Sequence, residues 1–156
     1  MAKISDINKL LSSTDINASI IELDNFIGEA CNYGDEMDQL TEPQRLFYLN
    51  QNLEREVNNG GFNQYFFNSS GDFAHETILS LNAIGATITA QILQKAIDQF
   101  PGKNAPKDRD EREIVLEQIE NVANEVWGEL DRQFLEYRDN LNNLNIEYVK
   151  RNKSFF

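Results

Sequence analysis

The only histidine of the chain, His75, lies in a run of side chains that could bind a metal ion. Asp72, His75 and Glu76 would share one side of a helix. Two carboxylates and an imidazole suit a hydrolytic metal, provided that several such ligands converge. However, acidic residues are also typical of the first turn of a helix, where the macrodipole favours negative charge. We favour this second interpretation, a helix start without a metal.

The one cysteine and the adjacent glycines give little support for catalysis. Cys31 would need a base such as His75 beside it, and isolated cysteines more often pack as small apolar residues. The pair Gly60-Gly61 does not match a phosphate-binding loop, because no lysine follows it and Glu56 would repel a phosphate. We therefore predict no catalytic residue, no bound metal and no cofactor, and thus a protein that is not an enzyme.

The segment Glu56–Asn68 combines two adjacent glycines, several amide side chains and four aromatic rings. Buried amides must find hydrogen-bond partners, so such a segment favours a single geometry. In a structural interpretation, Gly60 and Gly61 form a turn between helices and the rings enter the core. The amides would then bind backbone groups at helix ends, a role for Asn58, Asn59, Gln64 and Asn68.

A functional interpretation of the same segment is a small pocket for a polar ligand. Polar groups converging on a concave surface are typical of ligand sites. The candidate lining residues are Glu56, Asn58, Asn63, Gln64 and His75. We favour the structural interpretation and keep the pocket as the alternative.

Composition narrows the class of partner. The 156 residues are enough for one domain, and 26 acids against 14 bases give a formal net charge of −12. Bare nucleic acid and anionic membranes are poor partners for such a chain, whereas a basic protein surface fits it. The single cysteine precludes an internal disulfide. The N-terminal residues do not have the pattern of a signal peptide, and no apolar run is long enough to span a membrane. We therefore expect a cytoplasmic protein.

The acids gather in two segments. Eight acids and no base lie between Lys9 and Arg45, and eight acids with only Arg112 lie from Asp110 to Asp131. Helical neighbours three or four residues apart are separated by about 5–6 Å along the axis, so such rows can approximate phosphates, which lie about 3.4 Å apart on each DNA strand. The candidate partner-binding acids are Asp24, Glu29, Asp35, Glu36, Asp38, Asp110, Glu113, Glu117 and Glu120. On spacing alone, an ordinary solvated helix face is the simpler interpretation, and the basic tail Lys150–Lys153 interrupts the negative surface.

Along most of the chain, apolar residues recur at helical spacing, so the elements that position the candidate residues should be helices. This periodicity predicts an all-α, single compact bundle-like domain of about seven to eight helices over residues 1–156, with acidic helices in 1–39 packed on the rest. A first long helix should begin at Ile16, capped by Asp15 or a neighbouring hydroxyl, and end at Gly34. The next should begin at Thr41 with a capping box to Gln44 and stop at Asn59-Gly60.

From residue 62 onward, the sequence predicts five further helices, of which the first is short. A short helix over 62–68 precedes a helix over 73–84, which Asp72 should cap and which should bury Leu79. Helices follow over 87–100, from Asp108, and over 141–149. The long helix from Asp108 should bury the stripe formed by Val115, Ile119, Val122, Val126, Leu130 and Phe134.

Four motifs in fixed order resemble a known family. They are Leu40–Arg45, Glu56–Gly71, Ala83–Ala86 and Leu130-Asp131, and the resemblance covers about residues 40–150. The chain resembles a bacterial helical family that was first catalogued as a domain of unknown function and that includes a DNA-mimic protein. Its signature falls here on Glu56, Asn58, Asn59, Gly60, Gly61, Phe62, Gln64, Tyr65, Phe66, Asn68 and Gly71.

This resemblance implies a protein that occupies the DNA-binding face of a transcription factor through an acidic surface. Because the signature is amide and aromatic, we expect it to determine the fold, with any mimicry on the acidic faces elsewhere. Members of one fold family need not share a partner. A structural homodimer joined by an aromatic surface is a third hypothesis, beside the basic partner and the ligand pocket.

Overall fold

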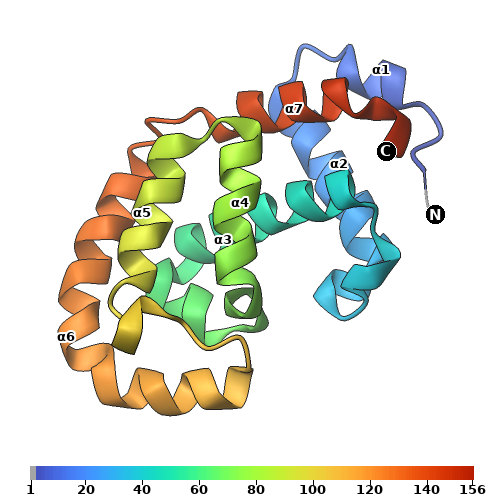
Figure 1. Cartoon of the computed structure of the whole chain (residues 1–156). Coiled ribbons are helices and arrows are strands. Elements are labelled where there is room, and N and C mark those ends of the chain that lie inside the picture. The colour runs from blue at the N-terminus through green and yellow to red at the C-terminus, as the bar shows by residue number, and fades with distance from the viewer. Residues whose placement is uncertain (1–2) are drawn as a thin grey trace.

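The computed structural model describes residues 3–156, and this part of the chain is all-α, as predicted. Met1 and Ala2, the start of the N-terminal segment in which no leader is expected, lie outside the described residues. Seven α-helices and no strand occur within residues 3–156 (Figure 1). The helices are α1 (Ile7–Leu11), α2 (Ile16–Ala30), α3 (Glu42–Phe67), α4 (Ala74–Ile84), α5 (Thr87–Ile97), α6 (Arg109–Leu135) and α7 (Leu141–Arg151). Short 3-10 turns are η1 (Asn32–Gly34), η2 (Met37–Gln39), η3 (Ser69–Phe73), η4 (Pro101–Lys103) and η5 (Lys153–Phe155).

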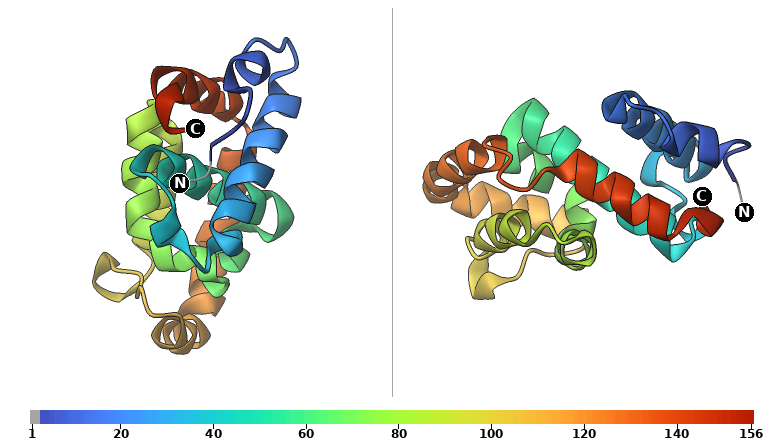
Figure 2. Two further views of the ribbon diagram at one scale, coloured as in Figure 1. Left: turned by 90° about the vertical axis from the view of Figure 1, so that its right-hand side faces the viewer. Right: turned by 90° about the horizontal axis from the view of Figure 1, so that it is seen from above.

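Two apolar clusters form the interior, and α3 and α7 contribute to both. One cluster joins α4, α5 and α6 with the second half of α3, and the other joins α1 and α2 with the first half of α3. Neighbouring residues of α7 divide between them, since Tyr148 packs in the first cluster and Val149 in the second. Figure 2 shows α7 running from the α6 side of the molecule to the α1 and α2 side, near both termini.

Several predicted helix ends are confirmed. Thr41 and Gln44 form the capping box of α3, with the Gln44 N–H donating to Thr41 Oγ1 at 3.4 Å and the Thr41 N–H donating to Gln44 Oε1 at 3.1 Å. Asp15 caps α2 by accepting from the Ala18 N–H at 3.0 Å. The predicted junction in α3 also occurs, because the backbone leaves the helical conformation at Gly60 and Gly61 before the helix resumes.

Three predicted details are wrong. α2 ends at Ala30 rather than Gly34, because Asn32 and Tyr33 take positive φ values of 48° and 54° that cannot continue a right-handed helix. α5 ends at Ile97, and the chain tightens into 3-10 bonds before Pro101. Asp72 does not cap α4, since its carboxylate binds an arginine of α6 instead.

The buried face of α6 differs from the predicted stripe. Val122 and Val126 are 75% and 36% exposed, whereas the buried residues are Arg112, Leu116, Ala123, Trp127, Leu130 and Phe134. Val115 and Ile119 are only partly buried at the edge of the first cluster. Leu79 on α4 is likewise exposed, at 67%. The true buried face contains a small residue and a charged one, which a search for apolar periodicity passes over.

Candidate functional site

Glu56 links the two halves of α3 across the kink. Its Oε2 accepts from Gln64 Nε2 at 2.6 Å and from Asn68 Nδ2 at 3.0 Å, and its Oε1 accepts from Ser70 Oγ at 3.1 Å. Asn59 Nδ2 in turn donates to Gln64 Oε1 at 3.1 Å. Of the four amides expected to bind backbone groups, Asn58 does so, since its Nδ2 donates to the Glu54 carbonyl at 2.7 Å. The amides of Asn59, Gln64 and Asn68 bind other side chains instead.

The kink itself requires glycine at Gly61. Its φ is +73°, and a Cβ there would lie 2.2 Å from Asp131 Oδ2. Asp131 Oδ1 accepts from the Phe62 N–H at 2.8 Å, so a carboxylate of α6 caps the second half of α3. Burial raises the pKa of Asp131, and the bond from Phe62 partly offsets that rise. Asp131 belongs to the Leu130-Asp131 motif, but its capping role could not be predicted from that motif.

The aromatic part of the segment fills the core, as the structural interpretation predicts. Phe62, Tyr65 and Phe66 are fully buried. Phe66 lies in tilted contact with Trp127 at 5.3 Å between ring centroids and edge-on to Phe100 at 4.9 Å. The Tyr65 hydroxyl donates to Thr77 Oγ1 at 3.2 Å, which satisfies its polar atom inside the core.

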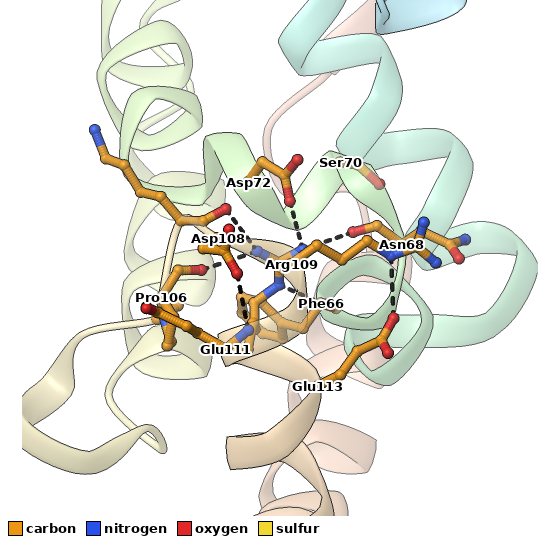
Figure 3. Close-up of polar contacts among 12 residues, drawn as sticks. Phe66, Asn68, Ser70, Asp72, Pro106, Asp108, Arg109, Glu111 and Glu113 are labelled. Carbon is orange, nitrogen blue, oxygen red and sulfur yellow. Dashed lines mark hydrogen bonds and ion pairs between the residues drawn. The ribbon is translucent and has the colours of Figure 1, made fainter.

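Arg112, on α6, is fully buried beside the signature. Figure 3 shows its partners Phe66, Asn68, Asp72 and Pro106 gathered at the start of α6. Its guanidinium makes five hydrogen bonds: to the carbonyls of Phe66 (2.6 Å), Asn68 (3.0 Å), Pro106 (2.8 Å) and Lys107 (3.1 Å), and to Asp72 Oδ1 (2.6 Å). Five partners match the five N–H donors of arginine, and the Asp72 carboxylate balances the charge. A Cβ on Gly71 would lie 2.8 Å from Arg112 Nε, so glycine is required there too.

The metal triad considered above does not assemble. Asp72 binds Arg112, Glu76 pairs with Arg45 at 2.7 Å, and His75 Nε2 contacts the Ala105 carbonyl at 3.1 Å. Within residues 3–156, no group of three or more His, Cys, Asp or Glu side chains is arranged to hold a metal ion. Cys31 is fully buried, and this burial raises the pKa of its thiol.

The alternative pocket residues also have separate partners. Glu56 and Gln64 bind each other, Asn58 Nδ2 donates to the Tyr137 hydroxyl at 2.6 Å, and Asn63 Nδ2 donates to Asn124 Oδ1 at 2.9 Å. His75 lies on α4 and faces the Ala105 loop. The structure therefore does not bring these five side chains to one place.

Four of the candidate partner-binding acids form a row on α6. Spacings of three and four residues place Asp110, Glu113, Glu117 and Glu120 on one flank of the helix, which we call the α6 acid row. Three of them are exposed, and the half-exposed Glu113 accepts from Arg109 Nε at 3.1 Å. Because Arg112 is buried and paired, it does not offset the charge of this row. The row belongs to the first part of α6, at the bottom of Figure 1.

The other candidate acids lie where α2 leads into α3. Glu29, Asp35, Glu36 and Asp38 are exposed, at the end of α2 and around η1 and η2. Asp24 differs from them, because it is partly buried and accepts from Arg55 Nη2 at 2.5 Å. Its charge is therefore already balanced within the protein.

Basic side chains gather at the opposite end, where the two termini meet. Lys3 Nζ donates to the Ser154 carbonyl at 2.8 Å, and Lys153 Nζ donates to Asn8 Oδ1 at 3.3 Å. Lys150 and Arg151 close α7 in the same region, at the upper right of Figure 1. These bases lie away from the α6 acid row, and Lys150 among them pairs with Glu147 at 2.8 Å.

Comparison with known proteins supplies the family. A family model described as DMP19-like protein matches residues 38–152, close to the range of about 40–150 predicted from the motifs. No curated protein and no solved structure matches the chain. Nor does any helix within residues 3–156 have the length and apolarity needed to cross a membrane. The chain therefore belongs to the DMP19-like family, a helical family that includes a DNA mimic.

Proposed function

We propose that this protein is a non-enzymatic, acidic binding protein that occupies the DNA-binding face of a basic transcription regulator in the cytoplasm. The observation that carries the proposal is the burial of Arg112. The only base between Asp110 and Asp131 is taken into the interior and paired with Asp72, so every charged side chain that this stretch of α6 exposes is a carboxylate. Family membership supports the same interpretation.

The α6 acid row is suited to meet lysine and arginine side chains that otherwise bind phosphates. Its carboxylates stand on a rigid helix whose other side is locked into the core by Arg112, Leu116 and Trp127. Preorganised charges lose little conformational entropy on binding, and a field of one sign accelerates encounter with a basic partner. The exposed acids around η1 and η2 are a second contact region in this proposal.

A charge-matched pair of variants tests the proposal. The first variant converts the α6 acid row to amides (D110N, E113Q, E117Q and E120Q), and the control converts four acids elsewhere (E22Q, E125Q, E136Q and E147Q). Each variant has the same net charge, so only the position of the lost carboxylates differs. Tagged wild type and control should capture a DNA-binding protein from the lysate of the source cells at low salt, and the acid-row variant should not.

Equal capture by both variants would refute the assignment to the α6 acid row. Capture should also weaken as salt rises from about 0.1 M toward 1 M, because the Debye length falls from about 10 Å to about 3 Å. Salt-independent capture would indicate an apolar interface and contradict the proposal. Thermal unfolding of each variant controls for loss of structure.

A further inference from the structure

A hollow of ≈ 370 Å³ lies between α3 and the connection from α6 to α7. It is lined by Glu54, Tyr137, Asn140, Leu141 and Asn142. None of these residues belongs to the α6 acid row or to the family signature. Leu141 is buried and, with the ring of Tyr137, provides an apolar wall beside polar groups. Such a mixture of apolar wall and convergent polar groups is typical of a ligand site.

The carboxylate of Glu54 is not neutralised within the protein. The Tyr137 hydroxyl lies beside it and lowers its pKa, and Asn58 Nδ2 donates both to that hydroxyl at 2.6 Å and to the Glu54 backbone carbonyl at 2.7 Å. The second carboxylate oxygen, Oε2, is shielded from water and has no hydrogen-bond partner. The adjacent base, Arg55, pairs with Asp24 at 2.5 Å. Burial raises the pKa of Glu54, and the charge of Asp24 raises it further, as expected for a carboxylate that lacks a cation.

The backbone at Tyr137 is held in an unfavourable conformation beside this carboxylate. Its φ is +47°, a left-handed value that a residue with a Cβ rarely adopts. The Tyr137 N–H donates to the Phe134 carbonyl at 3.0 Å, and the two rings pack edge-on at 5.9 Å. Residues in such conformations cluster at binding sites, where the fold holds a side chain in place. Here the strained residue positions the hydroxyl that contacts Glu54.

We propose that the hollow binds an alkyl cation with N–H donors, the chemistry shared by a lysine or arginine side chain and a free alkyl amine. Glu54 supplies the balancing charge, and the Tyr137 ring and Leu141 contact the methylene groups. The amide oxygens of Asn140 and Asn142 can accept further N–H donors: Asn140 Oδ1 accepts from only the Asn143 N–H, and Asn142 uses its Nδ2 to reach Asn17 Oδ1 at 2.7 Å. This inference does not depend on the proposed function, since it uses other residues.

Titration of the ¹⁵N-labelled protein, followed by two-dimensional NMR, tests the site. The probes are n-butylguanidinium and n-butylammonium, with tetramethylammonium as a cation that has no N–H donor. We expect the first two to give saturating shifts at the backbone amides of residues 137–143 and at the side-chain amides of Asn140 and Asn142. E54Q should weaken their binding about tenfold or more, because a charge-assisted hydrogen bond is lost. Y137F should also weaken it.

Matched controls distinguish binding in the hollow from the general electrostatic attraction of cations to an acidic protein. E125Q removes one exposed acid of α6 and should leave the shifts near Asn140 unchanged. A blocked tripeptide, acetyl-Ala-Arg-Ala-amide, distinguishes the two sources: binding like that of butylguanidinium supports a protein side chain as ligand, and binding of the free cations alone supports a small amine. Shifts scattered over the acidic surface, equal for tetramethylammonium or unaffected by E54Q, would overturn the proposal.

Discussion

Single residues explain why the signature tolerates so few alternatives. Glu56 binds three side chains across the kink, Asp131 caps a helix to which it does not belong, and Arg112 uses every N–H donor. Each of these contacts is buried or partly buried, where a lost partner leaves a polar group without compensation. Folding alone is therefore sufficient to explain the choice of residues in this region.

Replacing Arg112 with lysine tests the role of the guanidinium fork. Lysine keeps the charge but offers three donors from one point, so at least two of the five hydrogen bonds are lost. We expect R112K to lower the free energy of unfolding by about 1–3 kcal/mol, measured by urea denaturation. R109K, on the exposed side of the same helix, is the control. Equal stability of R112K and wild type would contradict this account.

Gly61 should be far less replaceable than a glycine in open space. Gly61 and Gly85 both have positive φ, but a Cβ at Gly61 would meet Asp131 Oδ2 at 2.2 Å and one at Gly85 would meet nothing within 4 Å. G85A therefore reports the backbone strain alone, about 1–2 kcal/mol. We expect G61A to destabilise the fold more than G85A does in thermal unfolding. Equal costs would show that Asp131 moves away freely.

Glu54 should make stability depend on pH. Its folded pKa is raised above the ordinary value of 4.5 by burial and by Asp24 on α2, opposed by the Tyr137 hydroxyl. The folded state therefore holds the proton more tightly, and stability present below pH 4.5 is lost as pH rises through the raised pKa. E54Q avoids this loss, because glutamine carries no titrating carboxyl.

We therefore expect E54Q to melt at a higher temperature than wild type at pH 7, with a difference that shrinks as pH falls toward 4.5. E125Q gives the effect of removing one charge without a buried carboxylate. A melting difference that stays constant over this range, or that favours wild type at pH 7, would refute the argument.

At the scale of elements, helix starts and the kink could be predicted from sequence because they depend on local chemistry. Asp15, Thr41 and the Gly60-Gly61 pair act through neighbours a few residues away. The buried face of α6 could not be predicted this way, because Val122 and Val126 outrank Ala123 in apolarity and Arg112 reads as solvent-exposed. The burial of Arg112 depends on hydrogen bonds to the backbone carbonyls of Phe66 and Lys107, which are far apart in the chain and which only the fold brings together.

The hollow near Glu54 was missed for the same reason. Its residues come from position 54 and from positions 137–142, which are far apart in the chain. The nearest candidate residue in the sequence was Asn58, whose Nδ2 donates to the Glu54 carbonyl and to the Tyr137 hydroxyl. Of the candidate acids, the sequence could predict that those on α6 share a flank, but not that Asp24 pairs with Arg55.

A pair of truncations tests the corrected face of α6. Leu116 is buried in the first apolar cluster, so L116A should lower the free energy of unfolding by about 2–5 kcal/mol. V122A removes a side chain that is 75% exposed and should change stability by about 0.5 kcal/mol or less. Urea denaturation measures both. The reverse order would restore the face predicted from periodicity.

At the scale of the whole molecule, charge is distributed unevenly over a rigid helical frame. The α6 acid row lies away from the terminal region, where Lys3, Lys150, Arg151 and Lys153 gather, whereas Glu29 at the end of α2 lines the same hollow as Lys3. A polarised molecule approaches a basic partner in a preferred orientation, with its basic end turned away. This arrangement explains how a chain with a basic tail can still present an acidic binding face.

Competition with DNA is the most direct test of the proposed function. The regulator captured by the tagged protein would be bound to its own fluorescent DNA duplex, and increasing amounts of wild type or acid-row variant would be added. The account predicts that wild type releases the duplex completely and in proportion to its concentration, whereas the acid-row variant releases little. A ternary complex of protein, regulator and DNA, or equal release by both proteins, would contradict it.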